Sequence, residues 1–149
     1  GAGTGSVSIT CAKCCPYGQV YAVEYQEQAL DILRQNCAYL QAENVTVLAG
    51  RAETVLSELP VPDCIFIGGS NGAFPEILRQ IQQLPKSVRL VVSAVTLETQ
   101  AEVTQLLQDA PQLEIIPVFS GQSRKVGRYH VLQPYHPVLL FACTGGKSS

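Results

Sequence analysis

The chain has 149 residues, of which 46% are hydrophobic and 15% are charged, and its formal net charge at pH 7 is −2. This composition is typical of a single domain with a buried core and excludes an intrinsically disordered chain. The chain has no general basic character to attract nucleic acid, and no apolar run reaches the roughly 18–20 residues that span a bilayer.

Apolar residues at helical or strand spacing predict the elements in chain order. Residues Gly1–Ser6 are typical of a tight glycine loop, and a helix is expected from Ser6 to about Cys15. Strand and helix then alternate. Strands are expected over residues 19–24, 45–50, 64–69, 89–95, 113–119 and 137–142. Helices are expected over residues 27–40, 51–58, 74–83 and 97–109, and a polar loop is expected over residues 121–128.

Continuous apolar strands that alternate with helices predict a Rossmann-like α/β fold, in which a mostly parallel sheet is covered by helices on both faces. Only a loop joins the last two strands, so the C-terminal strand is expected to be antiparallel to its predecessor. The glycine loop is the first strand-to-helix turn of such a sheet, where ligands bind. The first central strand, which should precede Gly1, is absent, so we expect a longer polypeptide with this domain at 1–144 and a disordered tail at 145–149.

Most of the cysteines lie in apolar periodic segments, where a thiol behaves as a small hydrophobe. The six are Cys11, Cys14, Cys15, Cys37, Cys64 and Cys143. We expect reduced core thiols in a cytoplasmic protein. Cys11 and Cys14 have C-x-x-C spacing, but Cys11 lies inside the predicted helix rather than at its N-terminus, where a redox cysteine has its pKa lowered. With no second C-x-x-C and only two histidines, no metal site is expected.

The glycine loop predicts a nucleoside cofactor site. Gly1, Gly3 and Gly5 let the backbone approach a ligand, and the helix behind them points N–H groups at it. Ser6 stands where the dinucleotide motif G-x-G-x-x-G has its third glycine, so the spacing favours S-adenosylmethionine over a nicotinamide cofactor. Glu24 ends the next strand, and its carboxylate suits the two ribose hydroxyls.

Three further segments are candidates for the site. Ala52, after the second strand, can offer its backbone N–H to adenine, or it is part of a simple turn. Residues 68–72 (Gly-Gly-Ser-Asn-Gly) follow the third strand and either border the reacting methyl group or serve only as a turn. Arg124, Lys125 and Arg128 either lie on a solvated loop or recognise carboxylates.

Five motifs occur in an order that resembles one family. They are residues 1–9 (GAGTGSVSI), 20–24 (VYAVE), 66–70 (FIGGS), 94–99 (AVTLET) and 127–130 (GRYH). Together they resemble the decarboxylating precorrin-6 carbon-15 methyltransferase of cobalamin biosynthesis, a family that includes the C-terminal half of the bifunctional carbon-5,15 enzyme. The first motif is generic to class I methyltransferases, whereas FIGGS, AVTLET and GRYH are far more specific.

The resemblance implies that a methyl group passes from S-adenosylmethionine to carbon 15 of an anionic tetrapyrrole, with loss of the ring C acetate carboxylate as carbon dioxide. It also implies a homo-oligomer, since members of the family form tetramers. The implied cofactor residues are Gly1, Ala2, Gly3, Thr4, Gly5, Glu24 and Ala52, and we expect Gly68 to be a further cofactor contact. The anionic substrate favours contacts to Arg124, Lys125 and Arg128, and we expect Ser70 to be a further substrate contact. Arg51 departs from the family, which often has Asp there. Candidates for a general acid or base are His130, Tyr129 and Asn71.

Three alternatives remain open at this stage. The chain could be a class I methyltransferase for another small molecule, a nicotinamide-binding module, or a truncated domain without catalytic activity. Calorimetry with S-adenosylhomocysteine and with NAD separates these readings.

Overall fold

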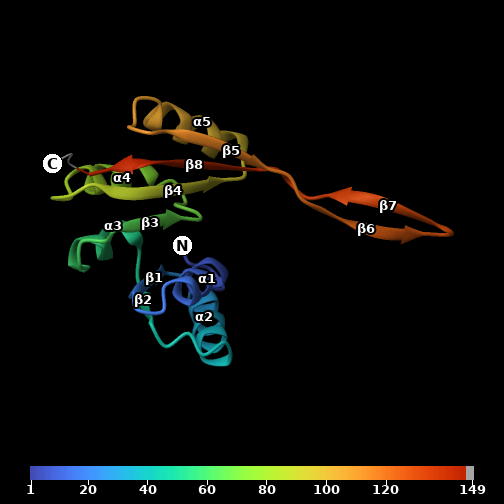
Figure 1. The fold of residues 1–149 in the computed structure, drawn as a ribbon, viewed down its shortest axis with the longest axis horizontal. Coiled ribbons are helices and arrows are strands. Elements are labelled where there is room, and N and C mark those ends of the chain that lie inside the picture. Colours follow the sequence, from blue (N-terminus) through green and yellow to red (C-terminus); the bar gives the residue numbers. More distant parts are fainter. Residues whose placement is uncertain (147–149) are drawn as a thin grey trace. The chain divides into compact units, whose positions relative to one another are not determined.

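The fold is described here from a computed structural model, which describes residues 1–146. The chain divides into two compact units. The first unit comprises Gly1–Pro60 and Gly68–Gln80, and the second comprises Val61–Ile67 and the residues from Ile81 onward. Figure 1 labels the helices and strands of both units.

The first unit is built on a pair of parallel strands. β1 (Val20–Glu24) pairs with β2 (Val45–Ala49), and Glu24 lies opposite Ala49 at the carboxyl ends of the two strands. Two helices, α1 (Ser6–Cys14) and α2 (Glu27–Tyr39), pack on these strands. The buried apolar side chains of these two strands and two helices are small or aliphatic: Ile9, Ala12, Ala22, Leu30 and Leu33. The predicted strand–helix alternation is therefore confirmed in this unit.

Further helical segments follow the strands at residues 45–49 and 64–67. α3 (Ala52–Val55) and the 3-10 helix η1 (Leu56–Glu58) come directly after β2. α4 (Phe74–Gln82) follows the second glycine-rich loop, and Phe74 at its start has no exposed surface.

The Asn44 amide donates to the carbonyls of Ala12, Cys15 and Gly18 at 2.9–3.1 Å, which fixes the turn between α1 and β1.

The second unit contains a four-stranded sheet in the order β3-β4-β8-β5. β3 (Cys64–Ile67) and β4 (Val88–Ala94) are parallel, whereas β8 (Val138–Gly145) runs antiparallel to β4 and to β5 (Glu114–Val118). The predicted antiparallel C-terminal strand is thus confirmed. The described strands form three sheets, namely the β1–β2 pair, this four-stranded sheet and a two-stranded hairpin, and no strand among residues 1–146 pairs with both β1 and β3.

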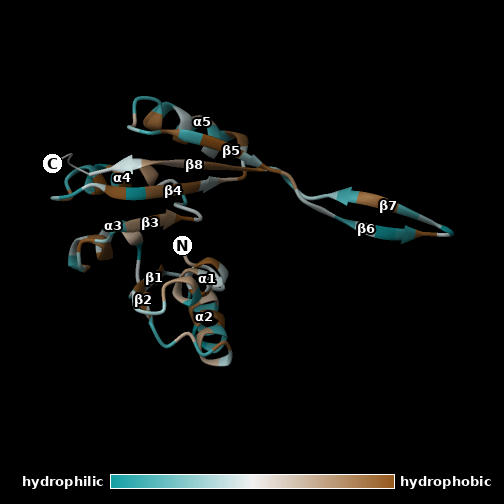
Figure 2. Cartoon of the chain, viewed as in Figure 1, coloured by the Kyte–Doolittle hydropathy of each residue, from teal (hydrophilic) through white to brown (hydrophobic). Residues whose placement is uncertain are grey.

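The core of the second unit lies between this sheet and its helices. α5 (Leu97–Leu107) packs on β4 and β8, and its N-terminal Thr96 accepts a hydrogen bond from Thr99 N at 3.2 Å. The buried side chains include Leu90, Val92, Val103, Leu107 and Phe141. Figure 2 shows the hydrophobic colour along β3 and β8. β8 buries Phe141, Ala142 and Cys143, whereas Ile67 is the one buried residue of β3.

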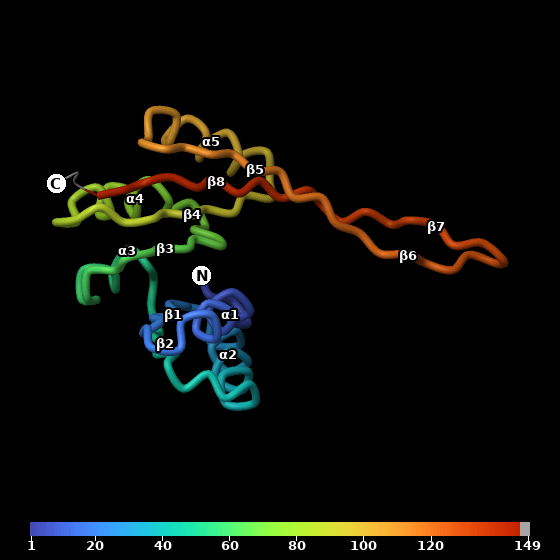
Figure 3. The backbone as a smooth tube through the Cα atoms, in the orientation of Figure 1, coloured from blue at the N-terminus to red at the C-terminus, as the bar shows by residue number. Residues whose placement is uncertain are grey.

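The expected polar loop at residues 121–128 is wrong, because the segment is half of a β-hairpin. β6 (Gly121–Val126) pairs with β7 (Tyr129–Pro134), and Val126 lies opposite Tyr129. The turn is therefore Gly127-Arg128, with Gly127 at φ 60°, a conformation that glycine adopts without strain. Every residue of the hairpin is exposed. Figure 3 traces the chain from β5 out along the hairpin and back into β8.

The expectation of core thiols holds for only part of the cysteines. Cys143 is buried on β8, and this burial raises the pKa of its thiol, whereas Cys37 is half-buried. The other four are exposed: Cys11, Cys14, Cys15 and Cys64. On α1 the reason is the helical period, which turns Ile9 and Ala12 toward the core and leaves the thiols outside.

The C-terminal end of the domain and the apolar character of the helices can also be compared with the sequence predictions. Gly145 is the last residue of β8 and lies opposite Val88, so the predicted tail does not begin at residue 145, and residues 147–149 lie outside the described residues. Within residues 1–146, none of the helices has the length and apolarity that crossing a membrane would require.

Candidate cofactor site

The glycine loop lies along the carboxyl end of β1, as the sequence predicts. Ala2 N donates to Val23 O at 2.9 Å, and Gly3 N donates to the Glu24 Oε2 atom at 2.8 Å. Gly5 ends the loop as the N-terminal capping residue of α1, and its carbonyl accepts from Ile9 N at 2.8 Å. Backbone hydrogen bonds therefore place the start of α1 directly above the strand end.

Gly3 and Gly5 serve different purposes. Both have positive φ, 56° and 86°, which other residues adopt only at a cost. A Cβ on Gly5 would collide with Cδ1 of Leu33, a fully buried side chain of α2. A Cβ on Gly3 would meet no atom within 4 Å. Gly5 thus lets α1 approach α2, whereas Gly3 leaves open space over the loop.

The Glu24 carboxylate holds the loop and the strand end together. The side chain is buried, with 5% of its surface exposed. Its Oε1 atom accepts from the backbone N–H groups of Tyr25 and Gln26, each at 2.9 Å, while Oε2 accepts from Gly3 N. Burial by itself favours the neutral acid, but the backbone donors at Gln26, Gly3 and Tyr25 outweigh it, so the pKa of Glu24 is lowered. The carboxylate is therefore charged at neutral pH.

The hydrogen bonds of the Glu24 carboxylate also show a structural role that the sequence does not reveal. A carboxylate offers about four acceptor positions, and three of those of Glu24 are taken by backbone N–H groups. One position on Oε2 remains for a ligand hydroxyl. Glu24 therefore shapes the loop, and it offers one free acceptor position where the sequence predicted contacts to two ribose hydroxyls.

Ala52 is placed at the neighbouring strand end. Gly50 N donates to Glu24 O at 2.8 Å, which ties the end of β2 to the end of β1. Ala52 is the first residue of α3, and the first N–H groups of a helix have no acceptor within the helix. The geometry is compatible with the predicted backbone contact to adenine.

The second glycine-rich loop, residues 68–72, lies against the first. Gly1 N donates to Gly69 O at 3.3 Å, and Ala73 N closes a turn by donating to Ser70 O at 2.9 Å. A Cβ on Gly69 or on Gly72 would meet no atom within 4 Å. The structure thus brings Gly68, Ser70 and Asn71 to the edge that carries Glu24.

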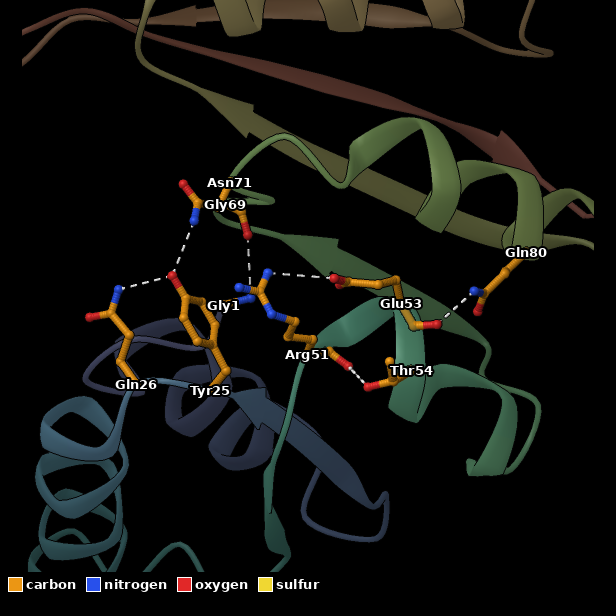
Figure 4. Close-up of polar contacts among 9 residues, drawn as sticks. All are labelled: Gly1, Tyr25, Gln26, Arg51, Glu53, Thr54, Gly69, Asn71 and Gln80. Carbon is orange, nitrogen blue, oxygen red and sulfur yellow. Dashed lines mark hydrogen bonds and ion pairs between the residues drawn. The ribbon is translucent and has the colours of Figure 1, made fainter.

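Sequence reasoning missed Tyr25, which connects three strand ends. The Arg51 guanidinium lies 4.9 Å from the centre of the Tyr25 ring and 3.6 Å from Glu53 Oε1. The Tyr25 hydroxyl accepts hydrogen bonds from the amides of Asn71 at 3.1 Å and Gln26 at 3.3 Å. Figure 4 shows these side chains converging beside Gly1 and Gly69. An aromatic residue directly after the strand-end carboxylate was the available signal.

The remaining predicted residues lie on the β6–β7 hairpin of the second unit. Lys125 pairs with His130 across the hairpin, so these two side chains share one face. Arg124 and Tyr129 are one residue removed and lie on the opposite face. Arg128 is in the turn, where its Nε donates to the Tyr129 hydroxyl at 2.8 Å. The two catalytic candidates on the hairpin, His130 and Tyr129, therefore lie on opposite faces.

The residues of the first unit fit an adenosyl cofactor. Open space lies over Gly3, Gly69 and Gly72, where a side chain would otherwise stand. A charged carboxylate with an unused acceptor position faces the loop. Among residues 1–146 there is no group of three or more His, Cys, Asp or Glu side chains that could hold a metal ion.

Two solved structures of known proteins are similar to this chain over nearly its whole length. The chain matches a crystal structure of precorrin-6y C5,15-methyltransferase from Geobacter metallireducens with a TM-score of 0.87 and 33% identity, over 96% of this chain and 77% of that one. A structure of precorrin 8W decarboxylase from Methanobacterium thermoautotrophicum matches with a TM-score of 0.85 and 29% identity, over 96% and 77%. The fold and the glycine-loop site define an S-adenosylmethionine-dependent methyltransferase of class I.

A family model for the precorrin methyltransferase domain matches residues 1–145. The chain belongs to this family. A relative from Pyrobaculum calidifontis, described as a probable cobalt-precorrin-6B C(15)-methyltransferase (decarboxylating), is 35% identical over 144 residues, which cover 94% of this chain and 73% of the relative. A relative of the same description from Methanocaldococcus jannaschii is 27% identical over 141 residues, covering 94% and 74%.

Proposed function

We propose that this chain transfers the methyl group of S-adenosylmethionine to carbon 15 of a precorrin-6B-type tetrapyrrole, with loss of the ring C acetate carboxylate as carbon dioxide, in cobalamin biosynthesis. The observation that carries the proposal is the family match over residues 1–145, together with the 35% identical relative of that description. The first unit supports it with a glycine loop, open space over Gly3 and a charged carboxylate at the strand end.

When bound, S-adenosylmethionine supplies a methyl group on a sulfonium, which needs no further activation. The protein then contributes mainly alignment, which is worth several kcal/mol for well-positioned reactants. Glu24 and the glycine loop would hold the nucleoside, and Ala52 N–H would face adenine. Ser70 and Asn71 would border the transferred group, and Arg124, Lys125 and Arg128 would contact substrate carboxylates.

Isothermal titration calorimetry tests the cofactor assignment. S-adenosylhomocysteine is expected to bind, and NAD is not, because Ser6 replaces the third glycine of the dinucleotide motif. Binding of neither ligand would support a non-catalytic domain. Binding of S-adenosylhomocysteine without turnover of a precorrin-6B-type substrate would favour a methyltransferase for another small molecule.

His130→Ala is expected to lower kcat roughly 100-fold or more, as loss of a general acid or base does, while changing the Kd of S-adenosylhomocysteine less than about threefold. Methyl-transfer kinetics and calorimetry on the same preparations measure both quantities. His136→Ala is the matched control, since His136 is the other histidine of the chain and is exposed. Turnover like that of the unaltered chain in His130→Ala would remove His130 from the mechanism. Tyr129→Phe then tests the opposite face of the hairpin.

The hairpin also supports a homo-oligomer, and the family resemblance favours a tetramer. A two-stranded hairpin alone is marginally stable in water. This one exposes Val126, Tyr129, Val131 and Leu132 by 47%, 61%, 43% and 85%. We expect analytical ultracentrifugation to give a multiple of the 16.0 kDa chain mass. A monomeric mass at micromolar concentration would contradict this. A cytoplasmic location stays a prediction.

A further inference from the structure

Tyr25 lies where the three strand-end segments of the first unit meet. Its ring makes a cation–π contact with the Arg51 guanidinium, which also forms an ion pair with Glu53 after β2. Its hydroxyl accepts from Gln26 on its own segment and from Asn71 in the loop that follows β3. One side chain therefore links segments that are 46 residues apart in sequence, and Figure 4 shows the three contacts together.

We propose that Tyr25 and Asn71 form a positioning pair, in which the Tyr25 hydroxyl holds the 68–72 loop in the geometry needed for methyl transfer. The proposal rests on the proposed function, because it takes this loop to border the transferred group. Asn71 then acts through the loop that it orients rather than as a general acid or base.

The backbone of the loop shows why such a tie matters. Asn71 has φ 49° and Gly72 has φ 83°, so two consecutive residues adopt the left-handed region. This conformation is unfavourable for most residues, and asparagine tolerates it better than others. The Asn71 amide, 3.1 Å from the Tyr25 hydroxyl, is a side-chain hydrogen bond that joins this loop to the segment after β1.

Cofactor binding and loop positioning depend on different atoms. The backbone N–H of Tyr25 donates to Glu24, and this hydrogen bond survives any change of the Tyr25 side chain. The ring stacks with Arg51, and only the hydroxyl bonds Asn71. Tyr25→Phe therefore removes the hydrogen bond to Asn71. It leaves the backbone hydrogen bonds to Glu24 and the aromatic ring in place.

The test is a double-mutant cycle on methyl transfer. Tyr25→Phe and Asn71→Gly, which keeps the left-handed backbone accessible, are each expected to lower kcat about tenfold, as small misplacements of reacting groups do. The double variant is expected to be no worse than either single variant, because both changes remove the same contact. Asn71→Asp is expected to recover most of the activity, since its carboxylate can accept the Tyr25 O–H.

Calorimetry with S-adenosylhomocysteine and thermal unfolding accompany the kinetics. Each variant is expected to keep the Kd within about threefold and to unfold within a few degrees of the unaltered chain. Tyr39→Phe is the matched control, because Tyr39 on α2 is 86% exposed and lies outside the site.

Three results would overturn the proposal: single variants with unchanged kcat, losses that multiply in the double variant, or a parallel loss of S-adenosylhomocysteine affinity. Failure of the unaltered chain to bind S-adenosylhomocysteine would instead reject the proposed function itself. The two failures are therefore distinguishable in the same set of measurements.

Discussion

Gly5→Ala is expected to lower the free energy of unfolding by about 3 kcal/mol. The left-handed backbone at φ 86° costs about 1–2 kcal/mol for a residue with a Cβ. The added methyl group would also collide with Leu33 Cδ1 in the contact between α1 and α2, and overpacking of a core costs about 1–3 kcal/mol. Denaturant unfolding followed by circular dichroism measures the difference.

Gly3→Ala is the matched control for this effect. Its φ of 56° carries a similar backbone cost, but its Cβ would meet no atom within 4 Å, so we expect a loss of only about 1–2 kcal/mol. The new methyl group would instead occupy the open space over the loop and weaken S-adenosylhomocysteine binding about tenfold or more. Equal losses of stability in the two variants would contradict the different purposes assigned to Gly3 and Gly5.

Glu24→Gln is expected to weaken S-adenosylhomocysteine binding about tenfold or more, because the one ligand hydroxyl that Glu24 can still accept loses a hydrogen bond to a charged group, which is worth about 1.5–3 kcal/mol. The new amide N–H₂ would face one of the backbone donors at Gly3, Tyr25 or Gln26, leaving that N–H without its acceptor. Calorimetry measures the affinity, and Glu27→Gln is the control, since Glu27 is exposed in the first turn of α2. Unchanged affinity would remove Glu24 from the cofactor site.

The same substitution changes the dependence of stability on pH. Because the pKa of Glu24 is lower in the folded chain, its contribution to stability is complete above the ordinary carboxyl range near pH 4.5 and disappears as pH falls through the lowered pKa. Glu76 acts in the same direction, since Arg79 and Gln80 lower its pKa to about 2. The difference between the unaltered chain and Glu24→Gln isolates Glu24, and acid unfolding curves that run parallel would contradict its lowered pKa.

The sequence by itself determined the order and type of the helices and strands outside the hairpin. Apolar runs such as residues 64–67 and 138–142 predict strands, since apolar periodicity reports which local structure can bury its side chains, although Cys64 and Phe66 are exposed. It also located the glycine loop and Glu24, because a loop, a helix and a strand-end carboxylate follow one another along the chain. It missed the hairpin, although Gly127 between Val126 and Tyr129 was a usable turn signal.

Only the tertiary structure decided what these residues contact. Three contacts join segments whose approach depends on packing: the hydrogen bond from Gly3 N to Glu24, the approach of Leu33 to Gly5, and the hydrogen bond between Asn71 and Tyr25. Cys11 is exposed because of the helix face that it occupies, and His130 and Tyr129 lie on opposite faces of the hairpin. Composition and spacing report local preference, whereas hydrogen bonds between residues 21 or 46 positions apart form only when the strands and helices have assembled.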